Sequence, residues 1–361
     1  MKLLVYTSWF RPTLGRDCGE MLFLGLERRG HELMGVMGDY KDDAWAEICR
    51  KRGWNFIPTL PEFSWPSSRW NEALLHHPEA RVKLEKWLEP IKLLQVQLGF
   101  SFFATWIPPA LANLPAQGFV NFHPAPLPQY RGYFPEDLIQ LRGLKSAGGT
   151  LHRVSSGIDE GPILLSTRAA RFTSGDTPDS ISQKISEAAL PDLWKGMDLW
   201  EKGRLPEKPQ DPGLAFDAGY EVLYSFSFAD WKRDDHKTLA RKFQVFRGQA
   251  HRMVLKGQWD DTLWTIWDWE LHPGNFQGNP GDYLGLIPIK GRQGPGVPLV
   301  RTQGGVCVIW DYEVYGKEMD SAPFVDQKKM HPEQVLAPGV RPRCLPSARL
   351  NPWRRNSPKR V

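Results

Sequence analysis

The residues best placed to do chemistry lie in one short stretch, residues 121–132, with the sequence NFHPAPLPQYRG. Asn121 and His123 stand two positions apart where a short apolar strand is expected to end near Asn121, and residues two apart on a strand project to the same side. An amide can donate hydrogen bonds to a developing oxyanion, and an imidazole can exchange a proton near neutral pH. The stretch therefore predicts a site for acyl chemistry at the carboxyl end of a strand, on a loop that its prolines stiffen.

A second stretch, residues 148–164 (GGTLHRVSSGIDEGPIL), complements the first. Alternation over residues 150–154 predicts another strand, and a loop that carries Asp159 follows it. The intervening residues 134–143 predict a helix that begins near a proline and ends at a glycine. A helix and a return strand are enough to bring Asp159 back beside His123, where a carboxylate favours the protonated imidazole.

Together the two stretches resemble the signature of the formyltransferases that use 10-formyltetrahydrofolate. That signature has an Asn-x-His-Pro segment ending in Tyr-Arg-Gly, followed by Gly-x-Thr-x-His and Asp-x-Gly-Pro. The matching residues are Asn121, His123, Pro124, Leu127, Pro128, Tyr130, Arg131, Gly132, Gly148, Thr150, His152, Asp159, Gly161 and Pro162. The chain departs from the signature at Ala125, at Pro126 and after Gly132, on the loop that borders the acceptor, and these departures leave the Asn-His-Asp set intact.

The resemblance implies an enzyme, a formyltransferase, with 10-formyltetrahydrofolate as the donor co-substrate and no metal. It implies that Asn121, His123 and Asp159 are catalytic. The residues expected to bind the folate are Phe100, Phe102, Ile107, Gly157, Ile158 and Gly161. Tyr130 and Arg131 are expected to contact the acceptor. His152 is expected to support its strand beside the site, and the histidines show no metal-ligand spacing.

The predicted fold class is α/β, with a Rossmann-like, mostly parallel sheet followed by a small β-rich, OB-like domain. The first sixty residues alternate strand, helix, strand, helix and strand, and this order predicts a parallel sheet with right-handed crossovers. A helix is expected over residues 17–29 and a central strand over residues 92–100. A long helix near residues 174–203 is expected to break or kink at Pro191. The first strand is not followed by G-x-G-x-x-G, so a dinucleotide site is not supported.

Composition shifts along the chain predict its domain organisation. Residues 1–204 are expected to form the formyltransferase domain, and residues 205–217 contain several prolines and few apolar residues, as in a linker. Residues 218–322 hold short runs rich in tryptophan, glycine and β-branched residues, which predict the OB-like domain. Residues 323–361 form a Pro-rich basic tail, for which disorder or loose packing is expected.

Length and composition bound the class of protein. The chain has 361 residues, too many for one ordinary domain, and 41% are hydrophobic, which is enough for a packed core. The net charge of +5 owes much to the tail, so charge alone does not indicate nucleic-acid binding. The four cysteines are scattered, as is typical of a reducing compartment, and the first residues do not resemble a signal peptide. We therefore predict a cytoplasmic protein without a membrane partner, for which a homodimer is one assembly to test.

The acceptor is expected to be a small molecule with a primary amine. Family members that act on initiator tRNA usually carry a basic, Gly-rich insertion after the second strand, whereas residues 37–48 here are short and acidic. The leading hypothesis is therefore a small amine, such as an amino-sugar nucleotide, with a tRNA acceptor (the methionyl-tRNA formyltransferase activity) as the alternative. A 10-formyltetrahydrofolate hydrolase would use the same three residues. A non-catalytic interaction protein that has kept the fold is a further alternative.

Overall fold

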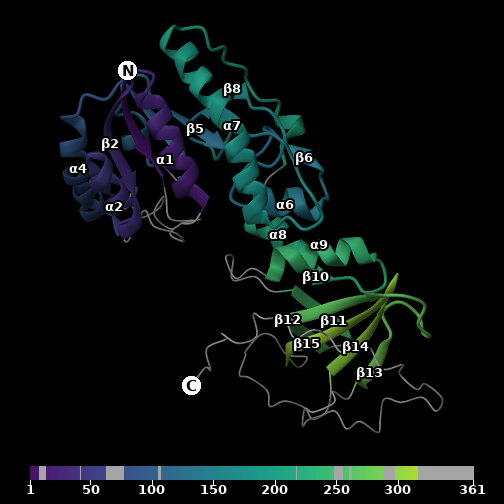
Figure 1. The fold of residues 1–361 in the computed structure, drawn as a ribbon. Helices are drawn as coiled ribbons and strands as arrows, with labels where there is room; N and C mark the ends of the chain where they lie inside the picture. Colours follow the sequence, from purple (N-terminus) through teal and green to yellow (C-terminus); the bar gives the residue numbers. More distant parts are fainter. Residues whose placement is uncertain are drawn as a thin grey trace. The chain divides into compact units, whose positions relative to one another are not determined.

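The computed structural model describes residues 1–7, 14–40, 42–61, 77–104, 107–216, 218–247, 255–259, 262–287 and 297–315. The chain divides into two compact units, Met1–Phe226 and Ser227–Val361, each of which is taken by itself (Figure 1). The expected linker, residues 205–217, falls inside the first unit. The basic tail, residues 323–361, lies outside the described residues. The division into a formyltransferase domain, a linker, an OB-like domain and a tail stays a prediction.

The first unit is built on a seven-stranded sheet with the order β3-β2-β1-β4-β5-β7-β8. Its strands are β1 (Lys2–Tyr6), β2 (Glu32–Gly38), β3 (Phe56–Pro58), β4 (Leu98–Phe102), β5 (Phe119–His123), β7 (Thr150–Arg153) and β8 (Ile163–Ser166). The strands from β3 to β5 pair in parallel, and β7 and β8 pair antiparallel at one edge. This arrangement confirms the predicted α/β fold with a mostly parallel sheet.

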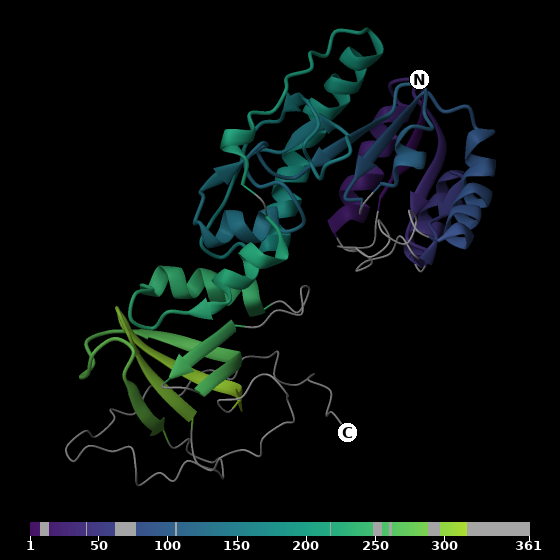
Figure 2. The same cartoon turned by 180° about the vertical axis from the view of Figure 1, so that it is seen from behind.

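Helices cover this sheet and connect its strands (Figures 1 and 2). They are α1 (Leu14–Glu27), α2 (Asp43–Arg52), α4 (Pro78–Lys92), α5 (Pro109–Ala112), α6 (Pro135–Leu141), α7 (Pro178–Glu201), the 3-10 turn η2 (Pro212–Leu214) and α8 (Tyr220–Phe226). The pair β6 (Ser146–Ala147) and β9 (Ala170–Arg171) forms a separate two-stranded sheet. The apolar side of α4, at Leu84, Leu88 and Ile91, packs in one core cluster with Leu4 and other residues of the sheet.

Several boundaries differ from the expected ones. Helix α1 ends at Glu27, and the strand expected over residues 92–100 is β4, which begins only at Leu98. The reason is that α4 continues through Lys92, where its buried face repeats with the period of a helix. Helix α7 continues through Pro191 without breaking. Leu190 and Leu193, on either side of this proline in α7, are buried in the core, and this packing outweighs the lost backbone hydrogen bond.

The second unit has a six-stranded sheet in the order β10-β11-β12-β15-β14-β13 within the described part of the chain. The elements are β10 (Phe228–Ala229), α9 (His236–Arg247), β11 (Leu255–Trp259), β12 (Thr262–Pro273), β13 (Tyr283–Ile287), β14 (Val297–Thr302) and β15 (Gly305–Tyr315). All neighbours except β10 and β11 pair antiparallel. Helix α9 packs on the sheet through the tilted rings of Phe243 and Trp269, whose centroids lie 4.0 Å apart with an interplanar angle of 38°. The β-rich character is confirmed, and the OB-like assignment stays a prediction.

Candidate active site

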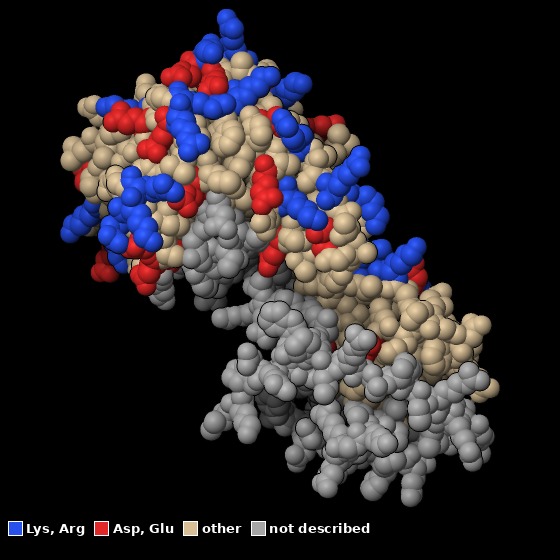
Figure 3. Space-filling model, viewed as in Figure 1, with Lys and Arg blue, Asp and Glu red and all other residues tan. Residues whose placement is uncertain are grey.

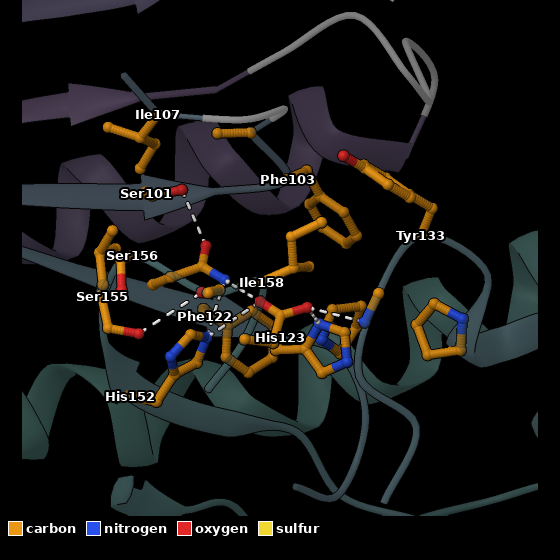
Figure 4. Close-up of a pocket in the computed structure, with 18 of the residues that line it drawn as sticks. Ser101, Phe103, Ile107, Phe122, His123, Tyr133, His152, Ser155, Ser156 and Ile158 are labelled. Carbon is orange, nitrogen blue, oxygen red and sulfur yellow. Dashed lines mark hydrogen bonds and ion pairs between the residues drawn. The ribbon is translucent and has the colours of Figure 1, made fainter. Parts of the chain in front are cut away.

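The carboxyl end of β5 positions the first two candidates. Within the sheet, Asn121 lies opposite Ser101 of β4 and opposite His152 of β7, and His123 lies opposite Thr150. Strand β5 extends through His123 instead of ending at Asn121, so both side chains come from the strand itself. Since they stand two positions apart, both reach the same cavity (Figure 4).

His123 is held through both of its ring nitrogens. Its Nε2 lies 2.7 Å from the carbonyl oxygen of Tyr130, and because a carbonyl can only accept, Nε2 carries a proton. Tyr130 has a φ of 59°, so the tight turn that presents this carbonyl uses the left-handed region. The other nitrogen, Nδ1, lies 3.4 Å from Oδ2 of Asp159. Nδ1 is therefore the nitrogen that can exchange a proton with Asp159 or with a reactant in the cavity.

The amide of Asn121 is oriented by its neighbours. The hydroxyl of Ser101 donates to Oδ1 of Asn121 at 2.8 Å, and the amide nitrogen therefore points the other way. That nitrogen lies 3.3 Å from Oδ1 of Asp159 and 3.0 Å from Nε2 of His152. A donor group fixed in this way needs no reorientation when charge develops on an oxygen nearby.

Asp159 joins the two halves of the site. Its Oδ2 accepts from the backbone N–H of Gly132 at 2.9 Å, and its Oδ1 lies 3.2 Å from Nε2 of His152. Burial disfavours the ionised carboxyl, but the charge of His123 and the hydrogen bonds from His152 and Gly132 outweigh it, so the pKa of Asp159 lies below its usual range. Asp159 is thus an ionised carboxylate whose φ of 53° is also in the left-handed region.

His152 takes part in the site more directly than its expected supporting role. Its Nδ1 lies 2.8 Å from the carbonyl oxygen of Arg153, so Nδ1 carries the proton. In the neutral ring Nε2 then accepts from the amide of Asn121, and in the charged ring it donates to Asp159. His152 therefore orients the amide and the carboxylate between which it lies.

The cavity at this site has a volume of about 150 Å³ (Figure 4). Three of the expected folate-binding residues, Ile107, Gly157 and Ile158, line it. Gly161 does not line it, and a side chain at this position would meet the carbonyl oxygen of Arg153. The glycine is therefore explained by the close approach of two backbone segments.

The structure revises the expected roles of Phe100 and Phe102. Both side chains are completely buried and neither lines the cavity, because the two faces of β4 are covered on either side. Phe103, one residue beyond the strand, lines the cavity instead. It has a φ of 56°, and this turn away from the strand direction brings its ring to the cavity wall (Figure 4). Trp106, the next aromatic residue along the chain, lies outside the described residues.

The two residues expected to contact the acceptor lie beside the cavity without lining it. Tyr130 is buried, and its ring packs against Phe216 with centroids 6.5 Å apart. The guanidinium of Arg131 donates to the side chain of Gln210 and lies 3.5 Å from a carboxylate oxygen of Glu160. The neighbouring cavity wall is formed instead by Gly132, Tyr133, Pro135 and Glu136. The acceptor-contact role of Tyr130 and Arg131 stays a prediction.

Three contributors were missed from the sequence: Ser101, the backbone N–H of Gly132, and Gln210. Ser101 had a usable signal, because it stands near the carboxyl end of the strand next to β5. The N–H of Gly132 belongs to the first motif, but its role as a donor to Asp159 depends on the turn at Tyr130. Gln210 comes from the presumed linker, and its sequence context carries no such signal.

The described residues show neither a metal cluster nor a membrane-spanning helix. Among the described ranges, three or more His, Cys, Asp or Glu side chains nowhere cluster in a way that could hold a metal ion. Within the same part of the chain, the helices are too short or too polar to cross a membrane. The predicted cytoplasmic location and the homodimer stay predictions.

This arrangement defines a class of chemistry. An oriented amide donor, an imidazole with one exchangeable nitrogen and an ionised carboxylate share one cavity wall. Such a set can stabilise an oxyanion at a carbonyl carbon and move a proton between the attacking and the leaving group. The fold and the site therefore define a group-transfer enzyme that acts on an acyl-type carbon.

Comparison with known proteins specifies the class. Residues 59–193 match the protein family described as Formyl transferase. This stretch contains β4 and β5, both motif segments and Asn121, His123 and Asp159. Residues 59–193 of this chain therefore contain a formyltransferase domain, and the chain is an enzyme of folate-dependent one-carbon transfer, as the resemblance of the motifs implied. The donor of the family is 10-formyltetrahydrofolate.

Individual relatives agree with this assignment. A methionyl-tRNA formyltransferase from Nitrosospira multiformis is 23% identical over 272 residues, which cover 73% of this chain and 79% of that protein. The structure of HypX from Aquifex aeolicus in complex with tetrahydrofolic acid superposes with a TM-score of 0.51 at 17% identity. The superposition covers 88% of this chain and 46% of the HypX chain. WlaRD, a sugar 3N-formyl transferase, superposes with a TM-score of 0.52 at 13% identity over 86% of this chain and 97% of WlaRD. These two structures show the likeness of the fold.

Proposed function

We propose that this chain transfers the formyl group of 10-formyltetrahydrofolate to a primary amine of a small acceptor, such as an amino-sugar nucleotide. The observation that carries the proposal is the mutual contact of Asn121, His123 and Asp159 at the wall of a single cavity. In this proposal the first unit carries out the reaction, as the expected domain organisation implies.

In the proposed reaction the amine nitrogen attacks the formyl carbon, and the carbonyl electrons move onto oxygen to form a tetrahedral oxyanion. The amide N–H of Asn121 donates to that oxyanion. The attacking nitrogen then loses a proton, the bond from the formyl carbon to the folate nitrogen breaks, and that nitrogen gains a proton. Nδ1 of His123, paired with Asp159, passes the proton between them. The products are the formamide of the acceptor and tetrahydrofolate.

The cavity walls suit the donor. Phe103, Ile107, Val154 and Ile158 present apolar surface, and Ile158 remains 47% exposed although it is a large aliphatic residue. A flat aromatic ring that covers such surface gains affinity from burial. A second hollow of about 980 Å³ shares Ile107 and Val154 with the cavity, so an elongated donor can extend from one into the other.

Two features favour a small acceptor. The connection from β2 to α2 consists of residues 39–42 only, and it includes the buried carboxyl-bearing residues Asp39 and Asp42. On the face of the first unit seen in Figure 3, basic and acidic side chains are interspersed. A nucleic-acid surface is expected to gather basic side chains instead, because the phosphate backbone dominates its affinity.

Transfer to methionyl-tRNA is the second candidate. It is favoured by the relatives themselves, since the protein from Nitrosospira multiformis that matches 73% of this chain is named a methionyl-tRNA formyltransferase. The two candidates differ in what must bind. A tRNA acceptor requires affinity that falls steeply with salt, whereas a small amine does not.

The test is an acceptor screen with 10-formyltetrahydrofolate. Purified chain is incubated with the donor and with separate pools of sugar-nucleotide amines, free amino compounds and methionyl-tRNA, and tetrahydrofolate release and formylated products are measured by mass spectrometry. We expect a formylated small amine. A product only with methionyl-tRNA would establish the second candidate, and release without any acceptor would identify a hydrolase.

Variants separate chemistry from folding in this screen. Asn121→Ala removes the proposed oxyanion donor and is expected to lower kcat by about 10²–10³-fold, as for other oxyanion-hole donors. Asn55→Ala is the matched control, because Asn55 is exposed and donates only a long 3.5 Å hydrogen bond to the carbonyl of Met34. Retention of more than a third of wild-type kcat by Asn121→Ala would refute the assigned role.

A further inference from the structure

The segment that follows α7 lies against the catalytic loops instead of acting as a free linker. We call residues 207–216 the strap. Its Lys208 exchanges both backbone hydrogen bonds with Ile163 of β8, each at 2.8 Å. Its Phe216 accepts from the backbone N–H of Arg131 at 3.0 Å. The strap is thus anchored to the strand after Asp159 and to the loop after His123.

Between these anchors, the side chain of Gln210 reaches both catalytic loops at once. Its amide nitrogen donates to the carbonyl oxygens of Asp159 and Gly161, each at 2.7 Å. Its amide oxygen accepts from Nε and Nη2 of Arg131 at 3.1 and 2.9 Å. A glutamine amide has two N–H donors and one oxygen with two lone pairs, so these four contacts use its full capacity.

The position of these contacts has a consequence for Asp159. The residue adopts a left-handed backbone conformation, which a residue with a side chain populates at a cost of about 1–2 kcal/mol unless its surroundings hold it. Gln210 holds the backbone on the carbonyl side, and the N–H of Gly132 holds the carboxylate. We propose that Gln210 is a positioning residue that sets the distance between the Asp159 carboxylate and the His123 imidazole.

This role rests on the catalytic role proposed for Asp159, and it deepens that proposal. Arg131 and Asp159 come from the two separate motifs, and Gln210 joins them through one side chain. Sequence separation makes this connection costly to form, because it closes a loop of about fifty residues between Asp159 and the strap. The pairing of Lys208 with Ile163 of β8 brings the strap to the same place independently of Gln210, and it helps to offset that cost.

Two substitutions separate the contacts that Gln210 makes through its amide nitrogen from those that it makes through its amide oxygen. Gln210→Glu keeps an oxygen that accepts from Arg131 but replaces the donors that face the carbonyls of Asp159 and Gly161. Gln210→Met keeps a similar length and removes both sets. Gln183→Met is the matched control, since Gln183 lies exposed on α7 and donates to Glu187 one turn away.

The first test measures amide hydrogen exchange and needs no turnover, so its failure is distinct from failure of the proposed function. The N–H of Gly132 reports on the carboxylate of Asp159, and the N–H of Val154, which donates to Phe119, reports on the neighbouring strands. In Gln210→Glu we expect protection of the Gly132 amide to fall about tenfold, as for a lost hydrogen bond with a charged group, while that of Val154 stays within about twofold. Unchanged protection of Gly132, or an equal fall at both amides, overturns the proposal.

The second test is a double-mutant cycle. Single-turnover release of tetrahydrofolate from 10-formyltetrahydrofolate, in the presence of the amine acceptor identified in the screen, is measured for Gln210→Met, Asp159→Asn and the combined variant, with Gln183→Met as control. If Gln210 acts through Asp159, its substitution lowers the rate about tenfold in the wild-type background and less than twofold when Asp159 is already Asn. Equal effects in both backgrounds would mean that Gln210 contributes only to the fold.

Discussion

Replacing Asp159 by asparagine is the sharpest test of the reaction scheme. The substitution keeps the size of the side chain and an oxygen that can accept from the N–H of Gly132. It removes a negative charge that lies 3.4 Å from Nδ1 of His123 and 3.2 Å from Nε2 of His152. The imidazolium that forms during proton transfer then has no counter-charge.

The magnitude follows from the first of these distances. Coulomb's law gives about 5 kcal/mol for unit charges 3.4 Å apart at an effective dielectric constant of about 20. The carboxylate side chain retains 13% exposure, and the amide keeps part of the hydrogen bonding. These two effects reduce the loss to about 3–4 kcal/mol, which corresponds to a fall of about 10²–10³-fold in kcat/KM.

The assay is tetrahydrofolate release with the acceptor identified in the screen, measured over a range of pH. Asp192→Asn is the control, because Asp192 pairs with Arg168 on the surface, and its kcat/KM is expected to stay within about twofold of wild type. Melting temperatures are recorded for both variants to exclude unfolding. If Asp159→Asn keeps more than a tenth of the wild-type kcat/KM, the carboxylate is not the counter-charge in the transition state and the reasoning fails.

Three further outcomes are expected. Gly25→Ala places a Cβ against the indole of Trp194, between α1 and α7, and should lower the free energy of unfolding by about 1–3 kcal/mol. Gly175→Ala is the control, because its Cβ has room and the variant should be near neutral. Equal melting temperatures for the two variants would contradict this packing. Because the pKa of Asp159 is depressed in the folded chain, its ionisation contributes stability that is complete above about pH 4 and is lost as the pH falls through the folded-state pKa. Asp159→Asn should therefore lose less unfolding free energy than wild type between about pH 5 and pH 3, and parallel denaturation curves would refute it. Burial raises the pKa of the Cys49 thiol to about 12, so mass spectrometry should detect its alkylation only in denaturant, and rapid labelling of the native chain would show otherwise.

Local patterns were sufficient to bring together the residues of the candidate site. Asn121 and His123 share a side of β5 because side chains alternate along any strand, and this holds wherever the strand lies. The alternation of strands and helices in the first sixty residues predicted the parallel sheet for a similar reason, since a short crossover leaves few other topologies. The motif around Asp159 followed from its own spacing and from its match to the family.

Local patterns failed where a residue's neighbours come from distant segments. Phe100, Phe102 and Phe103 have the same chemistry, and only the end of β4 and the turn after it decide which ring reaches the cavity. The strand expected over residues 92–100 begins only at Leu98, because α4 continues through Lys92, the first residue of the expected strand.

The class of fold followed from the amino-acid sequence because it depends on the period of the strands and helices. The candidate triad Asn121, His123 and Asp159 followed from residue type and spacing together with the resemblance to the formyltransferases. Only the tertiary structure decided that Gln210, in a proline-rich segment, holds the backbone of Asp159. The physical reason is that a glutamine amide carries no information about its partners until folding brings donors and acceptors within hydrogen-bond distance. Period and spacing act within a few residues, whereas this contact joins segments about fifty residues apart.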